Sequence, residues 1–198
     1  MVKVSLSSRG NAMKSLEAVK TLALWDLQDK SVFAVADLRR IFPERSEKTF
    51  SEGLRRLVAQ GVLERAARAA YVNALSQRSR RYLIEEIAAC MRRGEYSYVS
   101  LESALSEFGA ISQIPVSRIT VMTTGRGGLI ETRYGEIEFT HTARPVRNIL
   151  ASTLVMEGRP LRIARVETAL RDLKRVGRNL HMVDMEAYRD ILAEQAAA

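Results

Sequence analysis

Residues 33–73 constrain the fold of this chain more than any other stretch, because helix and strand patterns follow one another there at short spacing. An apolar-periodic segment over 33–42 leads into a turn at Pro43, and a second helical segment runs from Ser46 to Gly61. The residues that follow, up to Asn73, have the pattern of two short strands. A short helix, a turn, a second helix and a two-stranded wing together predict a winged helix-turn-helix.

The second helix of this stretch has an apolar and a polar face. Its apolar residues recur at helical spacing and are expected to face a core: Phe50, Leu54, Leu57 and Val58. At about 100° per residue, the long polar side chains fall on the opposite face, where a recognition helix needs donors for bases and phosphates. The residues expected to meet DNA, on this helix and beside the wing turn, are Ser46, Lys48, Thr49, Glu52, Arg55, Arg56, Arg65 and Arg68. The alternative is an ordinary solvated helix face.

Positive charge is concentrated in the first half of the chain. Residues 1–93 hold 18 Lys and Arg against 10 Asp and Glu, whereas residues 94–198 hold 13 of each, so the first half carries the net charge of +8. A basic half favours a polyanion, and nucleic acid is the usual partner. No membrane partner is expected, because no stretch approaches about 18 apolar residues and the basic residues lie on no strongly amphipathic helix.

The length of 198 residues allows two small domains. A helical pattern over 14–28 would complete the winged domain, with its inward side formed by Leu16, Val19, Ala23 and Leu27. A second helical pattern, over 75–93, begins with a basic run. The predicted organisation is a flexible N-terminal arm (1–13), a winged helix-turn-helix domain (14–75), a linker helix (76–93) and a C-terminal α+β domain (94–198).

The C-terminal part mixes strand and helix patterns, so the whole chain is expected to be α+β. The glycine run over 125–128 lacks the spacing of a phosphate-binding loop and is interpreted as a turn. Strands are expected over 119–123, 129–134, 136–142 and 161–163, and helices after Ser100, around Leu170 and after Asp184.

The sequence offers no catalytic or metal-binding constellation. His141 shares a strand face with Ile137 and Phe139 and is expected in the core, and the carboxylates of Glu136 and Glu138 are expected on the solvent side. No Cys and His residues stand at metal-ligand spacing. The predicted protein is therefore not an enzyme and uses no cofactor or metal. A single cysteine, Cys90, interpreted as core filler, and the lack of an apolar leader predict a cytoplasmic protein.

Four sequence blocks resemble the AbiEi-type antitoxins, the repressor half of type IV toxin–antitoxin pairs. In order they are GVLERAARAAYV (61–72), YVSLESALSEFG (98–109), GEIEFT (135–140) and LRIARVETALRD (161–172). Their succession, with the helix-turn-helix before them, covers most of residues 14–175. The chain departs from the family at Ala69 and Ala70, where a glycine is usual, and at Arg165 and Val166, where a small residue and proline are usual.

The resemblance implies an autorepressor that binds inverted repeats in its own promoter. It also implies a nucleotidyltransferase-like toxin, which the C-terminal domain counters without a stable complex, and a monomer or weak dimer that binds DNA cooperatively. Glu167 and Asp172 match the last block, but helix packing and a pairing of Glu167 with Arg171 explain them without a site. Two other classes remain open: a winged-helix regulator whose C-terminal domain serves dimerisation or ligand sensing, and a nucleic-acid enzyme with a winged-helix targeting domain.

Overall fold

The computed structural model describes residues 14–44, 46–112 and 117–197. The predicted N-terminal arm, residues 1–13, lies outside the described residues. The chain is mixed α+β and divides into two compact units, Met1–Ser79 and Arg80–Ala198. The division falls a few residues after the predicted end of the first domain at residue 75.

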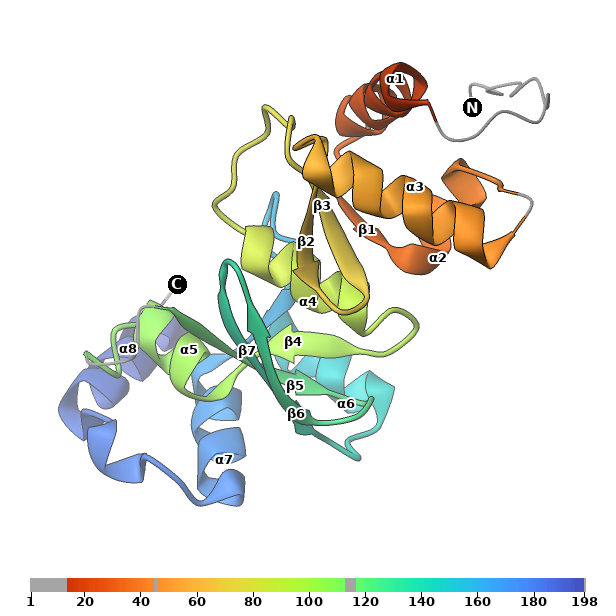
Figure 1. The fold of residues 1–198 in the computed structure, drawn as a ribbon. Coiled ribbons are helices and arrows are strands. Elements are labelled where there is room, and N and C mark those ends of the chain that lie inside the picture. Colours follow the sequence, from red (N-terminus) through yellow and green to blue (C-terminus); the bar gives the residue numbers. More distant parts are fainter. Residues whose placement is uncertain (1–13, 45, 113–116, 198) are drawn as a thin grey trace. The chain divides into compact units, whose positions relative to one another are not determined.

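Over its described residues, the first unit combines three helices with a small antiparallel sheet (Figure 1). The sheet order is β1-β3-β2, and Tyr71 lies between Phe33 and Arg65 in the register. A β-bulge between Arg65 and Ala67 bends the β2–β3 hairpin. In chain order the elements are α1 (Ser15–Asp26), β1 (Val32–Ala34), α2 (Val35–Ile41), α3 (Glu47–Ala59), β2 (Leu63–Ala67) and β3 (Ala70–Asn73).

Helix α3 has the limits and the inward face that its sequence predicts. The backbone N–H of Thr49 donates to the Ser46 hydroxyl at 3.1 Å, which caps the first turn. Past the other end, Gly61 adopts the left-handed conformation at φ +68°. The inward side chains join one hydrophobic core with residues from α1, α2 and the hairpin: Ala18, Leu22, Phe33, Leu38, Ile41, Phe50, Leu54, Leu57, Val62, Leu63 and Tyr71.

Helix α1 is present and Val19 packs against the core as predicted, but the prediction of its inward face was wrong for Leu16, Ala23 and Leu27. Ala18 and Leu22 are buried, whereas Leu16 and Leu27, expected inside, are 66% and 83% exposed. The helix carries apolar residues on more than one side, so periodicity alone could not choose between the faces. The choice depends on how α1 packs against the other helices of the unit.

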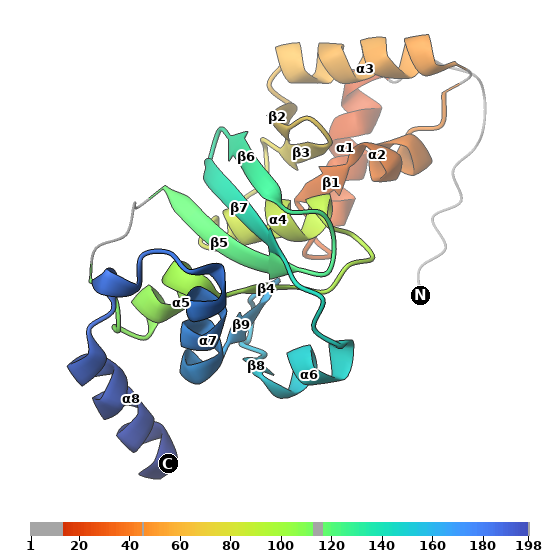
Figure 2. The ribbon, with the colours of Figure 1, turned by 90° about the horizontal axis from the view of Figure 1, so that it is seen from below.

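The second unit is a six-stranded mixed sheet with helices on both faces (Figure 2). Its order is β6-β7-β5-β4-β9-β8, with parallel pairs β7–β5 and β4–β9 and antiparallel pairs elsewhere. The elements are α4 (Leu83–Met91), β4 (Ser97–Val99), α5 (Leu101–Glu107), β5 (Arg118–Thr123), β6 (Gly128–Thr132), β7 (Gly135–His141), α6 (Val146–Ala151), β8 (Thr153–Leu154), β9 (Arg162–Ala164), α7 (Val166–Val176), the 3-10 turn η1 (Leu180–Met182) and α8 (Met185–Ala197).

The two faces of this sheet carry different side chains. Helix α4 contacts β5 and β7 on one face, while α5 contacts β5 and α7 on the other. The α4 face is apolar, with Ile137 and Phe139 both buried. The α5 and α7 face carries polar groups, among them Thr120, whose backbone N–H donates to the Ser103 hydroxyl at 2.8 Å. Because alternate residues of a strand point to opposite faces, β5 and β7 supply both surfaces.

Two expectations for this part of the chain are corrected. The helix expected over residues 76–93 begins only at Leu83 and packs on the second sheet, so it is part of the second unit and not a linker. His141 is exposed instead of buried, although Ile137 and Phe139 on the same strand are in the core. It is the last residue of β7, and a hydrogen bond of 2.9 Å joins its Nδ1 to the Gly125 carbonyl oxygen.

Candidate nucleic-acid interface

The outward face of α3 carries a row of long polar side chains. Lys48, Glu52, Arg55 and Arg56 are all exposed, while the opposite face of the helix is in the core. Thr49 is half-buried, and its hydroxyl lies 2.9 Å from that of Ser46. The structure therefore places four of the predicted α3 residues outward and uses the hydroxyl of Ser46 to hold the start of the helix.

The β2–β3 hairpin adds two exposed arginines, Arg65 and Arg68. The Arg65 guanidinium lies 3.5 Å from the Arg68 carbonyl oxygen, a long and weak hydrogen bond, so this side chain reaches over the hairpin turn. Both arginines retain solvent access on the turn, where the sequence placed them.

Arg39 of α2 contacts the start of α3 and was missed by the sequence reasoning. Its guanidinium lies 4.3 Å from the centre of the Phe50 ring and forms an ion pair with Glu47 in the first turn of α3. A side chain held in this way fixes α2 against the start of α3. The Arg39-Arg40 pair just before the turn was the available signal, but a pair of arginines alone does not say which one turns inward.

Formal charge divides unevenly between the structural units. Met1–Ser79 contains 14 Lys and Arg against 8 Asp and Glu, and Arg80–Ala198 contains 17 against 15. Most of the positive excess therefore lies in the unit that contains α3 and the hairpin. The second unit carries a smaller excess, because the structural boundary places Arg80 and Arg81 in that unit.

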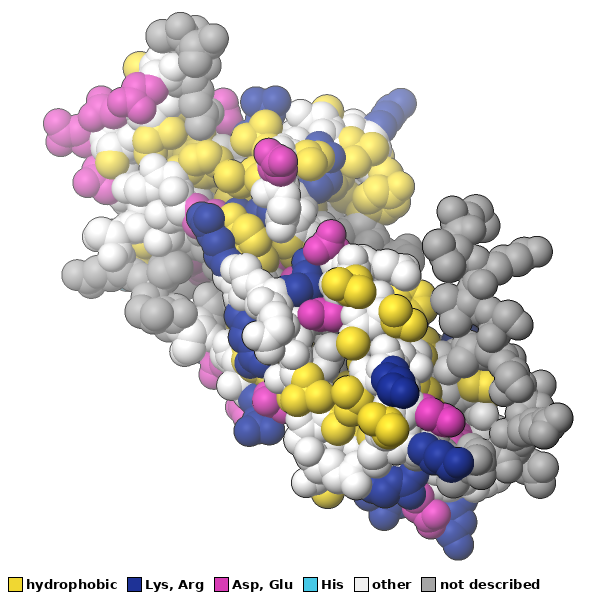
Figure 3. All heavy atoms as spheres, turned by 90° about the horizontal axis from the view of Figure 1, so that it is seen from above, with side chains coloured by type: hydrophobic (Ala, Val, Ile, Leu, Met, Phe, Trp, Pro, Cys, Tyr) yellow, Lys and Arg dark blue, Asp and Glu magenta, His cyan; other side chains and the backbone are white. Residues whose placement is uncertain are grey.

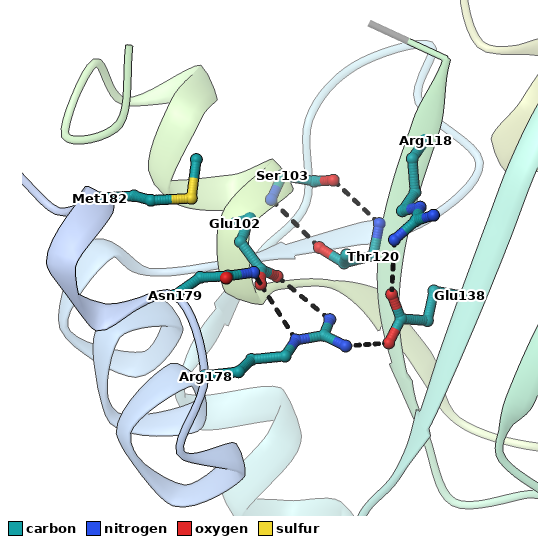
Figure 4. Close-up of a pocket in the computed structure, with 8 residues that line it drawn as sticks. All are labelled: Glu102, Ser103, Arg118, Thr120, Glu138, Arg178, Asn179 and Met182. Atoms are coloured by element: carbon teal, nitrogen blue, oxygen red, sulfur yellow. Dashed lines mark hydrogen bonds and ion pairs between the residues drawn. The ribbon is translucent and has the colours of Figure 1, made fainter. Parts of the chain in front are cut away.

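In the second unit, charged residues surround a hollow of about 100 Å³ between α5, β5, β7 and the segment after α7 (Figure 4). Arg178 forms ion pairs with Glu138 and with Glu102, the latter at 3.0 Å. Arg118 pairs with Glu136 at 2.6 Å and lies 3.7 Å from Glu138. Burial lowers the pKa of Arg178, but hydrogen bonds to Glu138 and Glu102 outweigh this and raise it.

This arrangement corrects the expectation that Glu136 and Glu138 are simply solvent-facing. The Glu138 side chain is 18% exposed and shares two arginines that come from distant parts of the sequence. Each carboxylate in the hollow therefore has a cationic partner, and the hollow is polar but electrostatically balanced. In a catalytic pair of carboxylates, different surroundings give the two groups different pKa values. The two carboxylates in this hollow instead each pair with arginine.

A second polar cluster surrounds Asp172 of α7, which is completely buried. Its carboxylate accepts hydrogen bonds from the Tyr98 hydroxyl at 3.1 Å and the Ser100 hydroxyl at 2.9 Å, and it pairs with Arg144 at 2.5 Å. Burial and the nearby Asp172 carboxylate raise the pKa of Tyr98. Ser100 does precede α5 as predicted, but its hydroxyl binds Asp172 and does not cap the helix.

A third cluster joins α4, α5 and the segment before β9 through Arg159. Its guanidinium binds Glu85 at 2.7 Å and Glu107 at 2.5 Å, and it lies 5.3 Å from the centre of the Tyr82 ring. Burial raises the pKa of Glu85, while the Arg159 hydrogen bond opposes the rise. In each of the three clusters an arginine thus pairs with a carboxylate that is buried in the second unit.

Among the described residues, no group of three or more His, Cys, Asp and Glu could hold a metal ion. Cys90 is half-buried on α4. Within the same described part of the chain, no helix is both long enough and apolar enough to cross a membrane. The surface with the clearest chemical character is therefore the basic face formed by α3 and the β2–β3 hairpin. No protein-family model matches the sequence, and a search of curated proteins gives no significant match.

Proposed function

We propose that the first unit is a winged helix-turn-helix domain that binds double-stranded DNA. The element order α1-β1-α2-α3-β2-β3 and the sheet order β1-β3-β2 support this, because they supply a helix pair followed by a two-stranded wing. In this proposal α3 enters the major groove. The hairpin arginines Arg65 and Arg68 contact the phosphate backbone beside it.

The observation that carries the proposal is the division of α3 into two faces. Phe50, Leu54 and Leu57 fix one face in the core, so the other face is held rigidly toward solvent. That face presents Lys48, Arg55 and Arg56. An arginine can bind both acceptors of a guanine in the major groove, and lysine adds attraction for phosphate. A Glu52 carboxylate on the same face can accept from a cytosine amino group.

At the level of the cell, we propose a cytoplasmic transcriptional autorepressor and antitoxin, on the basis of the resemblance to the AbiEi-type antitoxins. The first unit would bind inverted repeats in its own promoter, and the second would counter a nucleotidyltransferase-like toxin encoded beside it. The second unit suits a non-catalytic role because its buried charges are paired in structural clusters. The protein would act without enzymatic activity.

One observation favours a second candidate for the second unit, which is ligand sensing in a regulator that has no toxin partner. The hollow near Arg178 is lined by two arginines and two glutamates. A small anion could compete with Glu102 or Glu138 for Arg178 and so loosen the contacts between α5, β7 and the segment after α7. An adjacent gene whose product is not toxic, together with promoter control by this chain, would favour this candidate.

DNA binding is tested with the full chain and a duplex covering its own promoter, by fluorescence anisotropy. If about five phosphates are neutralised, the logarithm of the binding constant should fall against the logarithm of the salt concentration with a slope of about −4 to −5. Arg55→Ala should cost about 1–3 kcal/mol on promoter DNA and much less on unrelated DNA. Arg175→Ala, which removes the same charge from an exposed position on α7, is the control. Equal losses from both variants would refute the assignment of the α3 face.

The antitoxin role is tested separately, by co-expressing the chain with the product of the adjacent gene and following growth. A chain with Arg55→Ala should still neutralise the toxin, because the α3 face serves DNA binding only. Growth arrest that the wild-type chain cannot relieve would remove the antitoxin proposal and leave DNA binding untouched.

A further inference from the structure

The turn between β5 and β6 brings two arginines together at the end of α4 in the second unit. Arg92 is the C-cap residue of α4, and its guanidinium lies 4.0 Å from the centre of the Phe139 ring. Its Nε donates to the backbone carbonyl oxygen of Arg126 at 3.0 Å, and its Nη1 donates to that of Met91 at 3.3 Å. Arg126 itself is exposed on the turn. The Arg92 guanidinium is therefore held in place beside a second arginine.

The β5–β6 turn packs directly on the Arg92 side chain. A β-carbon at Gly125 would stand 3.3 Å from Cδ of Arg92 and 2.9 Å from Cγ of Glu95, so a larger residue would displace one of these side chains. On the other side, Nδ1 of His141 lies 2.9 Å from the Gly125 carbonyl oxygen. Three elements thus fix the place where the arginines meet: the end of α4, the turn and the end of β7.

The two arginines lack the carboxylate partners that arginines have in the three clusters of this unit. On the face drawn in Figure 3, basic and acidic side chains are interspersed. Among the described residues, however, no carboxylate forms an ion pair with the guanidinium of Arg92 or Arg126. Glu95 lies nearby, but its carboxylate accepts a hydrogen bond from the Thr124 hydroxyl at 2.7 Å. The pair is therefore a local excess of positive charge.

The free energy of this excess is visible in the titration of Arg92. Burial lowers the pKa of Arg92, the positive charge of Arg126 lowers it further, and the Glu95 carboxylate opposes both. Like charges that the fold holds together repel each other, and an anion between them relieves the repulsion. The arrangement therefore favours a negatively charged partner.

The remaining N–H groups of the two side chains suit the oxygens of a phosphate. A guanidinium has five N–H donors in a planar fork. The described contacts of Arg92 use one N–H on Nε and one on Nη1, so the donors of Nη2 remain for a ligand. Arg126 adds a second fork on the exposed turn. Such forks match the spacing of phosphate oxygens.

We propose that Arg92 and Arg126 form a second DNA contact, through which the second unit binds a phosphate of the DNA backbone. The inference rests on the DNA binding proposed for the first unit. That binding brings phosphates close to the covalently linked second unit, at a high effective concentration. Two arginines on an exposed turn bind a free phosphate only weakly, but a phosphate that is already nearby loses little freedom when it binds. Because phosphate contacts carry no sequence information, the pair adds affinity on any sequence.

The test is fluorescence anisotropy of the full chain with its promoter duplex and with an unrelated duplex of equal length, over a range of salt concentrations. Arg126→Ala should weaken binding to both by about threefold to fivefold, which is the range of a good exposed ion pair. The slope of the logarithm of the binding constant against that of the salt concentration should become shallower by about 1, and by about 2 in Arg92→Ala/Arg126→Ala. Arg126→Lys keeps the charge and should keep the wild-type slope.

Arg175→Ala is the matched control, because it removes the same charge from an exposed position of the same unit. Circular dichroism checks the fold of the double variant, since Arg92 also packs on Phe139. Arg126→Ala should leave the preference for promoter over unrelated DNA intact, whereas Arg55→Ala should reduce it. This difference separates the second contact from the α3 face.

Three results would overturn the second contact. If Arg126→Ala binds DNA as Arg175→Ala does while Arg55→Ala loses promoter preference, the second contact is wrong and DNA binding by the first unit stands. If the wild-type chain binds neither duplex, both proposals fail. If Arg126→Ala keeps wild-type DNA binding but no longer neutralises the toxin in the growth assay, the arginine pair serves an acidic protein surface instead.

Discussion

Substitution of Asp172 by alanine tests the polar cluster that holds α7 to the sheet of the second unit. The carboxylate is completely buried and has three partners: Tyr98, Ser100 and Arg144. Removing it leaves two hydroxyls without their acceptor and the Arg144 guanidinium without its counter-charge. The Arg144 side chain is only 12% exposed, so water can replace the lost carboxylate only in part.

The expected cost follows from these contacts. Breaking a buried ion pair by removing one partner destabilises a protein by about 3–5 kcal/mol. The partial exposure of Arg144 places the expectation for Asp172→Ala near the lower end, at about 3 kcal/mol. The double variant Asp172→Ala/Arg144→Ala should cost less than the sum of the two single changes, because it leaves no unpaired guanidinium.

Two optical probes can assign the loss to one unit. The chain has a single tryptophan, Trp25, which packs against the core of the first unit. Its fluorescence during urea unfolding therefore reports on that unit, whereas far-ultraviolet circular dichroism reports on both. Asp172→Ala should lower the circular dichroism midpoint and leave the Trp25 transition in place. Glu167→Ala, at an exposed position of the same helix, should change neither.

Two results would refute this reasoning. A cost below about 1 kcal/mol for Asp172→Ala would mean that the buried carboxylate is no more important than an exposed one. An equal shift of the Trp25 transition would mean that the two units unfold as one, and the cost could then not be assigned to the cluster alone.

Three further predictions concern the DNA interface and the second unit. Arg68→Ala should weaken binding to promoter and unrelated DNA by similar factors, since a wing arginine contacts phosphate. Fluorescence anisotropy with both duplexes measures this, and a loss of binding to promoter DNA alone would contradict it. The pKa of Tyr98 is raised above its ordinary 10.0 by burial and by Asp172, so the unfolded chain releases this proton first and stability falls as pH rises above about 10. Tyr98→Phe should reduce that fall by up to about 1.4 kcal/mol per pH unit in urea unfolding between about pH 9 and about pH 11, and an unchanged slope would contradict it. Leu170 is 5% exposed, so Leu170→Ala should destabilise the second unit by about 2–5 kcal/mol. This variant should lose toxin neutralisation in a growth assay while a promoter reporter stays repressed; loss of both neutralisation and repression would mean that DNA binding needs the second unit.

The elements with strong local signals could be predicted from the sequence alone. Helix α3 has its cap at Ser46, its apolar period from Phe50 to Leu57 and its stop at Gly61 within one short stretch. Strand β7 and helix α7 likewise carry their own patterns, and both are present in the structure. In each case the signal comes from neighbouring residues along the chain, so no knowledge of distant contacts is needed.

Only the tertiary structure decided which face of α1 is buried and whether His141 is covered. The surroundings of the α1 side chains and of His141 depend on elements far away in the sequence. Because α1 carries apolar residues on two sides, its pattern is compatible with burial of either side. The arginine clusters were beyond sequence reasoning for the same reason. Asp172 meets Tyr98 across 74 positions of the chain, and Arg178 meets Glu102 across 76. From the sequence alone, a charged side chain is expected to be exposed to solvent. Only the tertiary structure shows that an oppositely charged partner lies beside it, and such pairing allows both side chains to be buried in the core.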